Sequence, residues 1–225
     1  MTNVAIITAR AHSKGLPGKN LATVGGQSLV SRAINAALES NYVDRVIVST
    51  DGPDIAAEAR KLAAEIVWRP PYLATDDAKS IDAVCHALQS IGVAEGICVL
   101  LQPTSPLRTA SDVAEAIKQY CKNRVGSVIS VCESEHHPFK SLINKNGRME
   151  PLIDEQTFES PRQLLPKAVR LNGAIYVNKI EDLLAKRTFF CEPLFYYEMP
   201  RTRSIDIDES IDLMVARHLI GDFNE

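Results

Sequence analysis

Residues 3–20 read NVAIITARAHSKGLPGKN, a short apolar run followed at once by a basic loop that contains glycine. Residues 4–8 have the continuous apolar character of a buried strand in a parallel sheet. Glycines allow backbone N–H groups to approach an anion, and Arg and Lys side chains neutralise its charge. The stretch predicts a phosphate-binding loop at the end of a strand, with a solvated basic turn as the alternative. Its cationic side chains are Arg10, Lys14, Lys19 and, when protonated, His12.

The loop differs from the Walker A motif, which places four residues between its glycines and a Ser or Thr after its lysine. Here two residues separate Gly15 from Gly18, and Asn20 follows Lys19. The sequence also lacks the Gly-x-Gly-x-x-Gly pattern of dinucleotide-binding folds. A nucleoside triphosphate suits such a loop, but its cradle must be of another type.

Strand-like and helix-like segments alternate outward from this stretch. Strands are expected at residues 4–8, 45–50, 65–68, 97–102, 127–132 and 173–177, with further extended segments at 195–199 and 204–208. Helices are expected at residues 28–39, 54–64, 80–91, 111–120, 180–186 and 210–220, and Ser111 or Asp112 is expected to cap the fourth. This order predicts the α/β class, with a mostly parallel sheet flanked by helices. In such sheets, ligands bind at the carboxyl ends of the strands.

Residues 133–170 interrupt the alternation, with weak periodicity and several prolines. We expect an inserted arm within one domain that spans residues 1–225. His136 and His137 lie in this arm, but they lack partners at the spacing that zinc sites use, so a surface loop is the preferred interpretation.

The composition excludes some classes of protein. The net charge of −3 argues against broad nucleic-acid binding, which requires a strongly basic face. The five cysteines form no Cys-x-x-Cys pair, which suggests reduced thiols. The first apolar run is too short for a signal peptide or a membrane span. We therefore expect a cytoplasmic protein without nucleic-acid or membrane partners.

The sequence SIDID, residues 204–208, is a candidate metal site. In an extended chain alternate side chains share a face, so Asp206 and Asp208 point the same way. Their carboxylates repel each other, and Mg²⁺ relieves such repulsion while also binding substrate phosphates and water. The alternative is an edge strand whose aspartates face solvent.

Two other strand ends carry polar side chains. The stretch LLQPTSPLR, residues 100–108, suits the floor of a polar small-molecule site or a capped turn between strand and helix. The stretch VRLNGAIYVN, residues 169–178, could bind an anionic, hydroxyl-rich ligand, because the planar fork of Arg pairs with carboxylates. A strand preceded by a turn is the alternative. The polar residues of these stretches are Gln102, Thr104, Ser105, Arg108, Arg170, Asn172 and Tyr176.

TARAHSKGLPGKN, VSTDG, LLQPTSPLRT, EHHPFK, NGAIY and SIDID occur in an order that resembles bacterial CMP-sialic acid synthetases, the acylneuraminate cytidylyltransferases. The resemblance covers nearly the whole chain. It implies a nucleotidyltransferase (Rossmann-like) fold and a homodimer joined through residues 133–170. It also implies Mg²⁺-dependent transfer of CMP from CTP to the anomeric hydroxyl of a nine-carbon α-keto acid sugar, with release of pyrophosphate. N-acetylneuraminate is expected first; the alternatives are legionaminate, pseudaminate or another keto acid sugar, and a non-catalytic nucleotide-sugar-binding homologue.

The resemblance also implies roles for individual residues. Residues implied to bind CTP are Ala9, Arg10, Ser13, Lys19, Asn20, Arg69, Ala78 and Ser80. Residues implied to bind the sugar are Gln102, Thr104, Ser105, Lys140, Arg162, Arg170, Asn172, Tyr176, Phe189 and Phe190. Among these, Lys140 and Arg162 would reach the partner's site, and the two phenylalanines would receive the N-acyl group. The catalytic residues implied are Arg10, Lys19, Asp206 and Asp208, and the two aspartates would also hold Mg²⁺.

Overall fold

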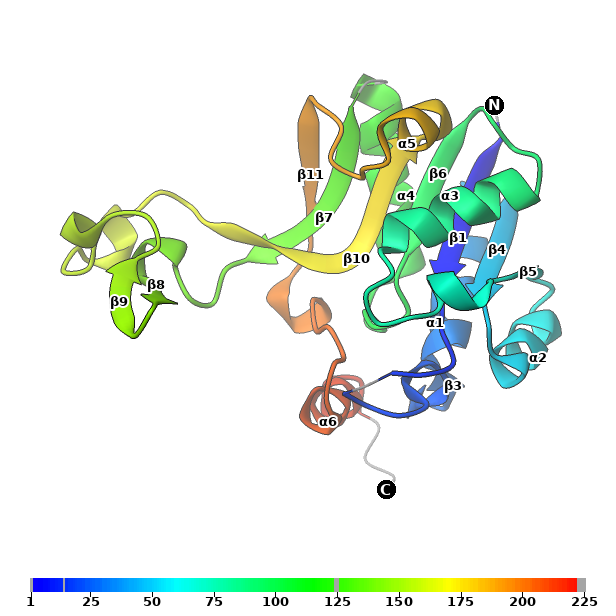
Figure 1. Ribbon diagram of the computed structural model, residues 1–225, viewed down its shortest axis with the longest axis horizontal. Coiled ribbons are helices and arrows are strands. Elements are labelled where there is room, and N and C mark those ends of the chain that lie inside the picture. Colours follow the sequence, from blue (N-terminus) through cyan, green and yellow to red (C-terminus); the bar gives the residue numbers. More distant parts are fainter. Residues whose placement is uncertain (1, 14, 124–125, 222–225) are drawn as a thin grey trace.

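The structure is a computed structural model that describes residues 2–13, 15–123 and 126–221, so Lys14 of the basic loop lies outside the described residues. The described residues form a central sheet of seven strands (Figure 1). These strands are β1 (Asn3–Thr8), β4 (Arg45–Thr50), β5 (Glu65–Trp68), β6 (Ile97–Leu101), β7 (Ser127–Glu133), β10 (Val169–Lys179) and β11 (Leu194–Glu198). Their spatial order is β11-β7-β10-β6-β1-β4-β5. Within the described part, only β10 runs antiparallel to its neighbours, so the predicted, mostly parallel α/β sheet is confirmed.

Helices cover both faces of this sheet. The helices α1 (Leu29–Leu38), α2 (Pro53–Lys61) and α4 (Ala110–Asn123) pack on the face that includes Ala5 and Ile7 of β1. The helices α3 (Ser80–Ser90) and α5 (Ile180–Lys186) pack on the opposite face, with Val4 and Ile6. Both faces of β1 are therefore buried, which explains why its sequence is continuously apolar.

A third, smaller core holds the end of the chain against the body. The helix α6 (Ser210–Leu219) packs against the hairpin of β2 (Thr23–Val24) and β3 (Gln27–Ser28), with Ile207 and Leu107 between them. The predicted extended segment 204–208 belongs to no sheet, so the edge-strand alternative is wrong. One backbone hydrogen bond of 2.8 Å, from Ile207 N to Thr104 O, ties it to the loop after β6. Ile207 is buried there, whereas Asp206 and Asp208 are accessible to solvent.

The predicted arm projects from the body of the molecule (Figure 1). It contains a two-stranded hairpin, β8 (Leu142–Lys145) with β9 (Arg148–Pro151), which the sequence analysis missed because its short strands are exposed and show no apolar alternation. The boundaries of the arm also differ from the expected 133–170. β7 continues to Glu133, and β10 begins at Val169, with a register shift between Leu171 and Tyr176.

The start of α4 corrects another expectation. The helix begins at Ala110, and neither Ser111 nor Asp112 caps it. Asp112 N donates to Thr109 Oγ1 over 3.2 Å, and Asp112 Oδ2 accepts from Thr109 N over 2.8 Å, so Thr109 is the cap. This reciprocal pair satisfies two backbone donors that a helix start leaves without partners. Across the ranges described, no helix is both long and apolar enough to cross a membrane.

Candidate active site

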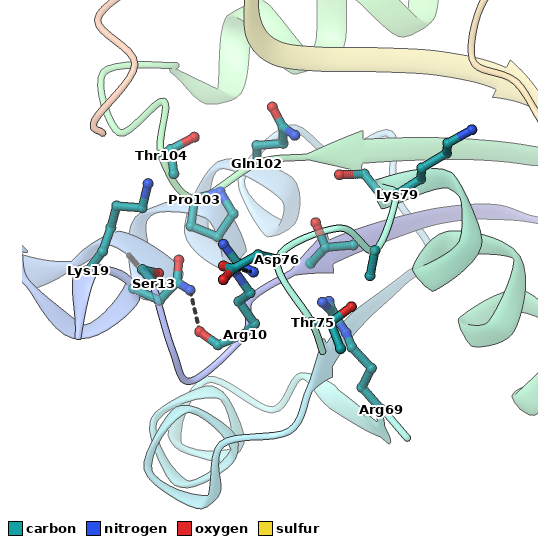
Figure 2. Close-up of a pocket in the computed structure, with 14 residues that line it drawn as sticks. Arg10, Ser13, Lys19, Arg69, Thr75, Asp76, Lys79, Gln102, Pro103 and Thr104 are labelled. Carbon is teal, nitrogen blue, oxygen red and sulfur yellow. Dashed lines mark hydrogen bonds and ion pairs between the residues drawn. The ribbon is translucent and has the colours of Figure 1, made fainter. Parts of the chain in front are cut away.

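A polar cavity of about 200 Å³ opens at the carboxyl ends of β1 and β6. The chain leaves β1 toward β4 on one side and later returns to β6 on the other, so the cavity lies at the topological switch point of the sheet. Figure 2 shows Gln102, Pro103 and Thr104 on one side, Arg69 and Thr75 on the other, and Arg10 between them. The lining residues are Thr8, Arg10, Ser13, Lys19, Asn20, Arg69, Thr75, Asp76, Ala78, Lys79, Ser80, Gln102, Pro103 and Thr104.

The basic loop after β1 forms one wall of the cavity. Asn20 is buried, and its Nδ2 donates to Arg10 O over 2.8 Å, which closes the loop. The guanidinium of Arg10 makes an ion pair with Asp76 at 2.7 Å. Ala9 does not line the cavity, because it is fully buried and its N–H donates to Ser49 O over 3.0 Å. The loop thus presents the side chains of Arg10 and Ser13 from a fixed backbone.

Lys19 links this loop to the segment 204–208. Its Nζ donates to Ile207 O over 2.8 Å and lies 3.0 Å from Asp208 Oδ1. The Lys19 side chain is 12% exposed and that of Asp208 is 75% exposed, so the lysine is largely buried whereas the carboxylate faces solvent. Gly15 allows the backbone of the basic loop to lie close to the backbone of Asp208, because a Cβ at position 15 would lie 2.4 Å from the carbonyl oxygen of Asp208.

Arg69 shapes the opposite wall. Its Nη2 and Nε donate to the carbonyl and hydroxyl oxygens of Ser49 over 3.0 and 3.3 Å, and its Nη1 donates to Leu73 O over 3.4 Å. Desolvation by burial lowers the pKa of Arg69. These hydrogen bonds fix the guanidinium, so its orientation toward a ligand in the cavity is constant. Ala78 and Ser80 line the cavity beside it, at the start of α3.

Asp206 lies next to the lining residues of the β6 side. Desolvation raises the pKa of its carboxyl group, and the charge of Asp208 adds to the rise, although a hydrogen bond with Thr104 opposes it. A Cβ on Gly173 would lie 2.9 Å from Gln102 Oε1 and 3.5 Å from Asp206 Oδ2. With a φ of +72°, Gly173 therefore brings these two side chains into one corner.

The two aspartates could hold a hard divalent cation. Among the residues described, no three His, Cys, Asp or Glu side chains gather as a ligand set. A cation here would rely on Asp206 and Asp208 together with substrate oxygens and water, which is the ligand set that Mg²⁺ accepts.

The predicted sugar-binding residues fall into separate groups. Gln102 and Thr104 line the cavity. Ser105 and Asn172 do not, because they are buried: Ser105 Oγ donates to Asn172 O over 3.1 Å, and Asn172 Nδ2 donates to Ser204 Oγ over 2.9 Å. Arg108 is also buried, donates to Gln102 O over 3.1 Å, and has a pKa lowered to about 10 by desolvation. These side chains support the floor of the cavity from beneath.

Phe189 and Phe190 do not form one wall. Phe189 is buried, and its ring lies 5.3 Å from that of Tyr176, centroid to centroid. Phe190 is 47% exposed. Burial raises the pKa of the Tyr176 hydroxyl, so this phenol stays neutral.

The remaining predicted residues belong to the arm and its base. Lys140 Nζ donates to Phe158 O over 3.2 Å within the arm. Arg162 donates to the carbonyl oxygens of Ser134 and Glu135 over 2.6 and 3.1 Å. Neither side chain lines the cavity of its own chain. Arg170 also lies outside the lining, and its guanidinium is paired with Glu135.

Comparison with known proteins decides the family. The cytidylyltransferase family model matches residues 4–158. The chain belongs to the cytidylyltransferase family. This cytidylyltransferase is 33% identical over 228 residues to an N-acylneuraminate cytidylyltransferase of Streptococcus agalactiae, with 99% of this chain and 54% of the relative covered. It spans about half the length of that relative.

A second relative matches nearly the whole of this chain. The CMP-N,N'-diacetyllegionaminic acid synthase of Legionella pneumophila is 32% identical over 229 residues, with 98% of this chain and 97% of the relative covered. Among solved structures, a CMP:2-keto-3-deoxy-manno-octonic acid synthetase complexed with CTP has a TM-score of 0.74 at 16% identity, with 98% of this chain and 99% of that chain covered. The resemblance to bacterial acylneuraminate cytidylyltransferases and the nucleotidyltransferase fold are therefore confirmed.

The cavity of the cytidylyltransferase includes residues that the sequence analysis did not predict. Thr75, Asp76 and Lys79 belong to the same segment, RPPYLATDDAKS, as the predicted Arg69 and Ala78. Their polar character and position in that segment were the available signal. Gly173 had a weaker signal, because nothing in the sequence indicates which side chains its missing Cβ would meet.

Proposed function

We propose that this cytidylyltransferase transfers CMP from CTP to the anomeric hydroxyl of a nine-carbon α-keto acid sugar, releasing pyrophosphate. One observation carries the proposal. A single cavity joins the cations Arg10 and Lys19, which suit a triphosphate, to the neutral polar groups of Gln102 and Thr104, which suit sugar hydroxyls. The two substrates would then meet at the switch point of the sheet.

The chemistry requires positioning and neutralisation of charge. The anomeric hydroxyl oxygen attacks the α-phosphorus of CTP in line, forming a new P–O bond as the bond to the β-phosphate oxygen breaks, and its proton would pass to a carboxylate, for which Asp206 is the candidate. Charge develops on the departing pyrophosphate, and Arg10 and Lys19 stabilise it. Arg69, Ala78 and Ser80 would orient cytosine and ribose from the opposite wall. Holding both substrates in line removes most of the entropic barrier to the reaction.

We also propose Mg²⁺ as the cofactor, held by Asp206 and Asp208. The residues fit it, because Asp206 and Asp208 supply hard carboxylate oxygens, and a divalent cation would offset the repulsion between their two charges. When bound, the ion supplies positive charge to the phosphate oxygens. The chain's own contribution is to hold Asp208 beside the Lys19 ammonium and to tie Ile207 to the loop after β6.

N-acetylneuraminate is the first sugar to test, in line with the Streptococcus agalactiae relative. The diacetylated legionaminate is the second candidate, because the Legionella pneumophila relative matches almost end to end. Among the residues expected to form the N-acyl pocket, Phe190 is exposed and free to contact a ligand, whereas Phe189 is committed to the core. Selectivity would therefore depend on Phe190 more than on Phe189.

The arm supports the proposal of a homodimer. It exposes large apolar side chains, namely Leu142, Ile143, Met149, Leu152, Ile153 and Leu164. A two-stranded hairpin is marginally stable alone, so a second copy that covers these side chains would stabilise it. In the dimer, Lys140 and Arg162 would reach the partner's cavity. The expected cytoplasmic location stays a prediction.

Pyrophosphate release tests the function. The protein would be assayed with CTP, Mg²⁺ and, separately, N-acetylneuraminate, N,N'-diacetyllegionaminate, pseudaminate and KDO. We expect turnover with one of the first three sugars. If CTP with Mg²⁺ raises the melting temperature but no sugar gives pyrophosphate, the protein is a nucleotide-binding homologue without this activity. If CTP gives neither turnover nor stabilisation, the proposed function is wrong.

A further inference from the structure

A bidentate ion pair lies at the base of the arm, outside the cavity. Arg170 Nε and Nη2 donate to the two carboxylate oxygens of Glu135 over 2.8 and 3.0 Å. Arg201 Nε approaches the same carboxylate at 3.4 Å. The hydrogen bonds from Arg170 hold the pKa of Glu135 at about 2, so this carboxylate is charged at every pH at which the protein would work. The fork of Arg170 is thus already filled by a carboxylate of its own chain.

Arg170 also contacts the segment that carries the two aspartates. Its Nη2 donates to Ser204 O over 3.4 Å, and its Nη1 donates to Leu171 O over 3.3 Å. From the same strand, Asn172 Nδ2 donates to Ser204 Oγ over 2.9 Å. Ser204 is fully buried. Two side chains of β10 therefore hold Ser204, two residues before Asp206.

These contacts matter because the segment 204–208 has no strand partner to hold it. Beyond Ser204, the segment is also held by the bond from Ile207 N to Thr104 O, by the bonds from Lys19 Nζ to Ile207 O and Asp208 Oδ1, and by the bond from Asp208 N to Asp212 Oδ2. The charge of Arg170 also acts on Asp206, whose pKa it lowers against the effect of desolvation. Residues that orient metal-binding side chains without touching the metal commonly change metal affinity or activity by about 10- to 100-fold when they are mutated.

We propose that Glu135 is a positioning residue: by holding Arg170, it ties the base of the arm to Ser204 and so fixes where Asp206 and Asp208 lie. The inference rests on the proposed function only for what the two aspartates bind. It gives Arg170 a role different from the expected contact with the sugar's carboxylate. A displacement of the arm at Glu135 would therefore shift the aspartates, through the contact of Glu135 with Arg170 and the contact of Arg170 with Ser204.

The test compares Glu135→Gln with a matched control, Glu65→Gln. Glu65 forms an equally bidentate pair with Arg45, with both distances 2.8 Å, in β4 and β5 at the far edge of the sheet. Hydrogen exchange of peptides covering residues 199–208 is measured without ligand. Mn²⁺ binding in the presence of CTP is measured by electron paramagnetic resonance. We expect Glu135→Gln to speed exchange in that peptide and to weaken Mn²⁺ binding about 10-fold or more, and Glu65→Gln to change neither.

A second variant keeps the test decisive if Glu135→Gln fails to fold. Arg170→Lys keeps the charge but loses the planar fork, so it should produce the same two changes in milder form. Wild-type exchange at residues 199–208 in a folded Glu135→Gln or Arg170→Lys variant would overturn the proposal. The proposal would also be overturned if Glu135→Gln lowered the melting temperature as much as Glu65→Gln does and changed nothing else. If the wild type itself binds no Mn²⁺ with CTP, the proposed cofactor is wrong, while the exchange result still decides the role of Glu135.

Discussion

At the scale of single residues, the site depends on where a few charges are held. Lys19 contacts the backbone carbonyl of Ile207 and the carboxylate of Asp208, and both contacts fix its ammonium at the cavity wall. Arg10 pairs instead with Asp76, and Figure 2 shows Arg10 between the two sides of the cavity. A triphosphate entering the cavity would meet one cation that is anchored to backbone and one that must exchange its carboxylate partner for phosphate.

We predict that Lys19→Ala lowers kcat/KM for CTP about 100-fold, because it removes a fixed positive charge from the region where pyrophosphate charge develops. Initial rates of pyrophosphate release measure the change. Lys61→Ala is the control, since Lys61 makes a surface ion pair with Glu58 at 2.7 Å, away from the cavity. Kinetics like those of the wild type in Lys19→Ala would remove this residue from the mechanism.

Gly173 gives a second prediction at this scale. Gly173→Ala and Gly147→Ala both place a Cβ at positive φ, at +72° and +83°, which costs about 1–2 kcal/mol of stability. Only the Cβ at position 173 meets neighbours, at 2.9 Å from Gln102 Oε1. We therefore expect roughly 10- to 100-fold lower kcat/KM for Gly173→Ala alone. Urea unfolding and kinetics on both variants make the comparison, and equal activities would contradict it.

The sequence could identify these residue types but not their surroundings. Lys19 and Gln102 were predictable as cavity residues because polar side chains that follow apolar strands gather at one edge of the sheet. Ser105 and Asn172 are as polar, yet they are buried, because each finds internal hydrogen-bond partners. The partner of Arg170 lies 35 residues away in the arm, and neither periodicity nor spacing indicates such a pairing.

At the scale of elements, strands buried on both faces were the easiest to predict. β1 and β6 read as continuous apolar runs because helices cover both of their faces. The length of β10 was underestimated, because its first residues leave the core and continue into the arm. The segment 204–208 alternates apolar and acidic residues as a strand does, but hydrogen bonds to a loop and to side chains hold it instead of a ladder.

The start of α4 provides a test of how elements are joined. Asp112 is buried and accepts hydrogen bonds from Thr109 of its own helix start, Tyr197 of β11 and Arg203. We predict that Asp112→Asn lowers the free energy of unfolding by about 3 kcal/mol, the low end for a broken buried pair, since Arg203 is 34% exposed and can turn to water. Urea unfolding measures this. Glu115→Gln, which removes an exposed pair with Lys118, should cost less than about 0.5 kcal/mol. Equal losses of unfolding free energy in the two variants would show that Asp112 does not stabilise the contact of α4 with Tyr197 and Arg203.

The base of the arm predicts a dependence of stability on pH. The pKa of Glu135 is about 2 in the folded protein, below the ordinary value of about 4.3 in an unfolded chain. Its stabilising contribution is therefore complete above about pH 5 and is lost as the pH falls toward 2. We expect the wild type to exceed Glu135→Gln in free energy of unfolding by about 1–2 kcal/mol at pH 7 and by clearly less at pH 3. Urea unfolding across this range would contradict the assignment if the difference stayed constant.

At the scale of the whole molecule, the arm is the feature that a single chain leaves unexplained. Its sequence was predicted to be irregular, and the structure adds a hairpin with apolar side chains on the outside. Hydrophobic periodicity in a sequence indicates which residues are buried within one chain. It does not indicate which exposed residues are buried against a second chain. The proposed dimer therefore could not be inferred from periodicity, and the expectation of a dimer came from the family resemblance.

We predict that Leu164→Asp weakens dimerisation at least 10-fold, because a charge would replace an apolar side chain that is 78% exposed on the arm. Sedimentation velocity at several concentrations measures the dissociation. Tyr72→Asp is the control, since Tyr72 is 70% exposed but lies on the body of the molecule. Dissociation caused equally by both substitutions, or by neither, would rule out the arm as the specific contact.

The contact between Lys19 and Asp208 spans 189 residues of sequence, which sets an order of events during translation. At typical rates of about 5–20 residues per second, roughly 10 to 40 seconds separate the appearance of the two residues on the ribosome. Throughout that interval the nascent polypeptide has its basic loop but lacks Asp208. The two carboxylates that the proposed mechanism requires, Asp206 and Asp208, are therefore supplied by a segment that is synthesised long after the basic loop.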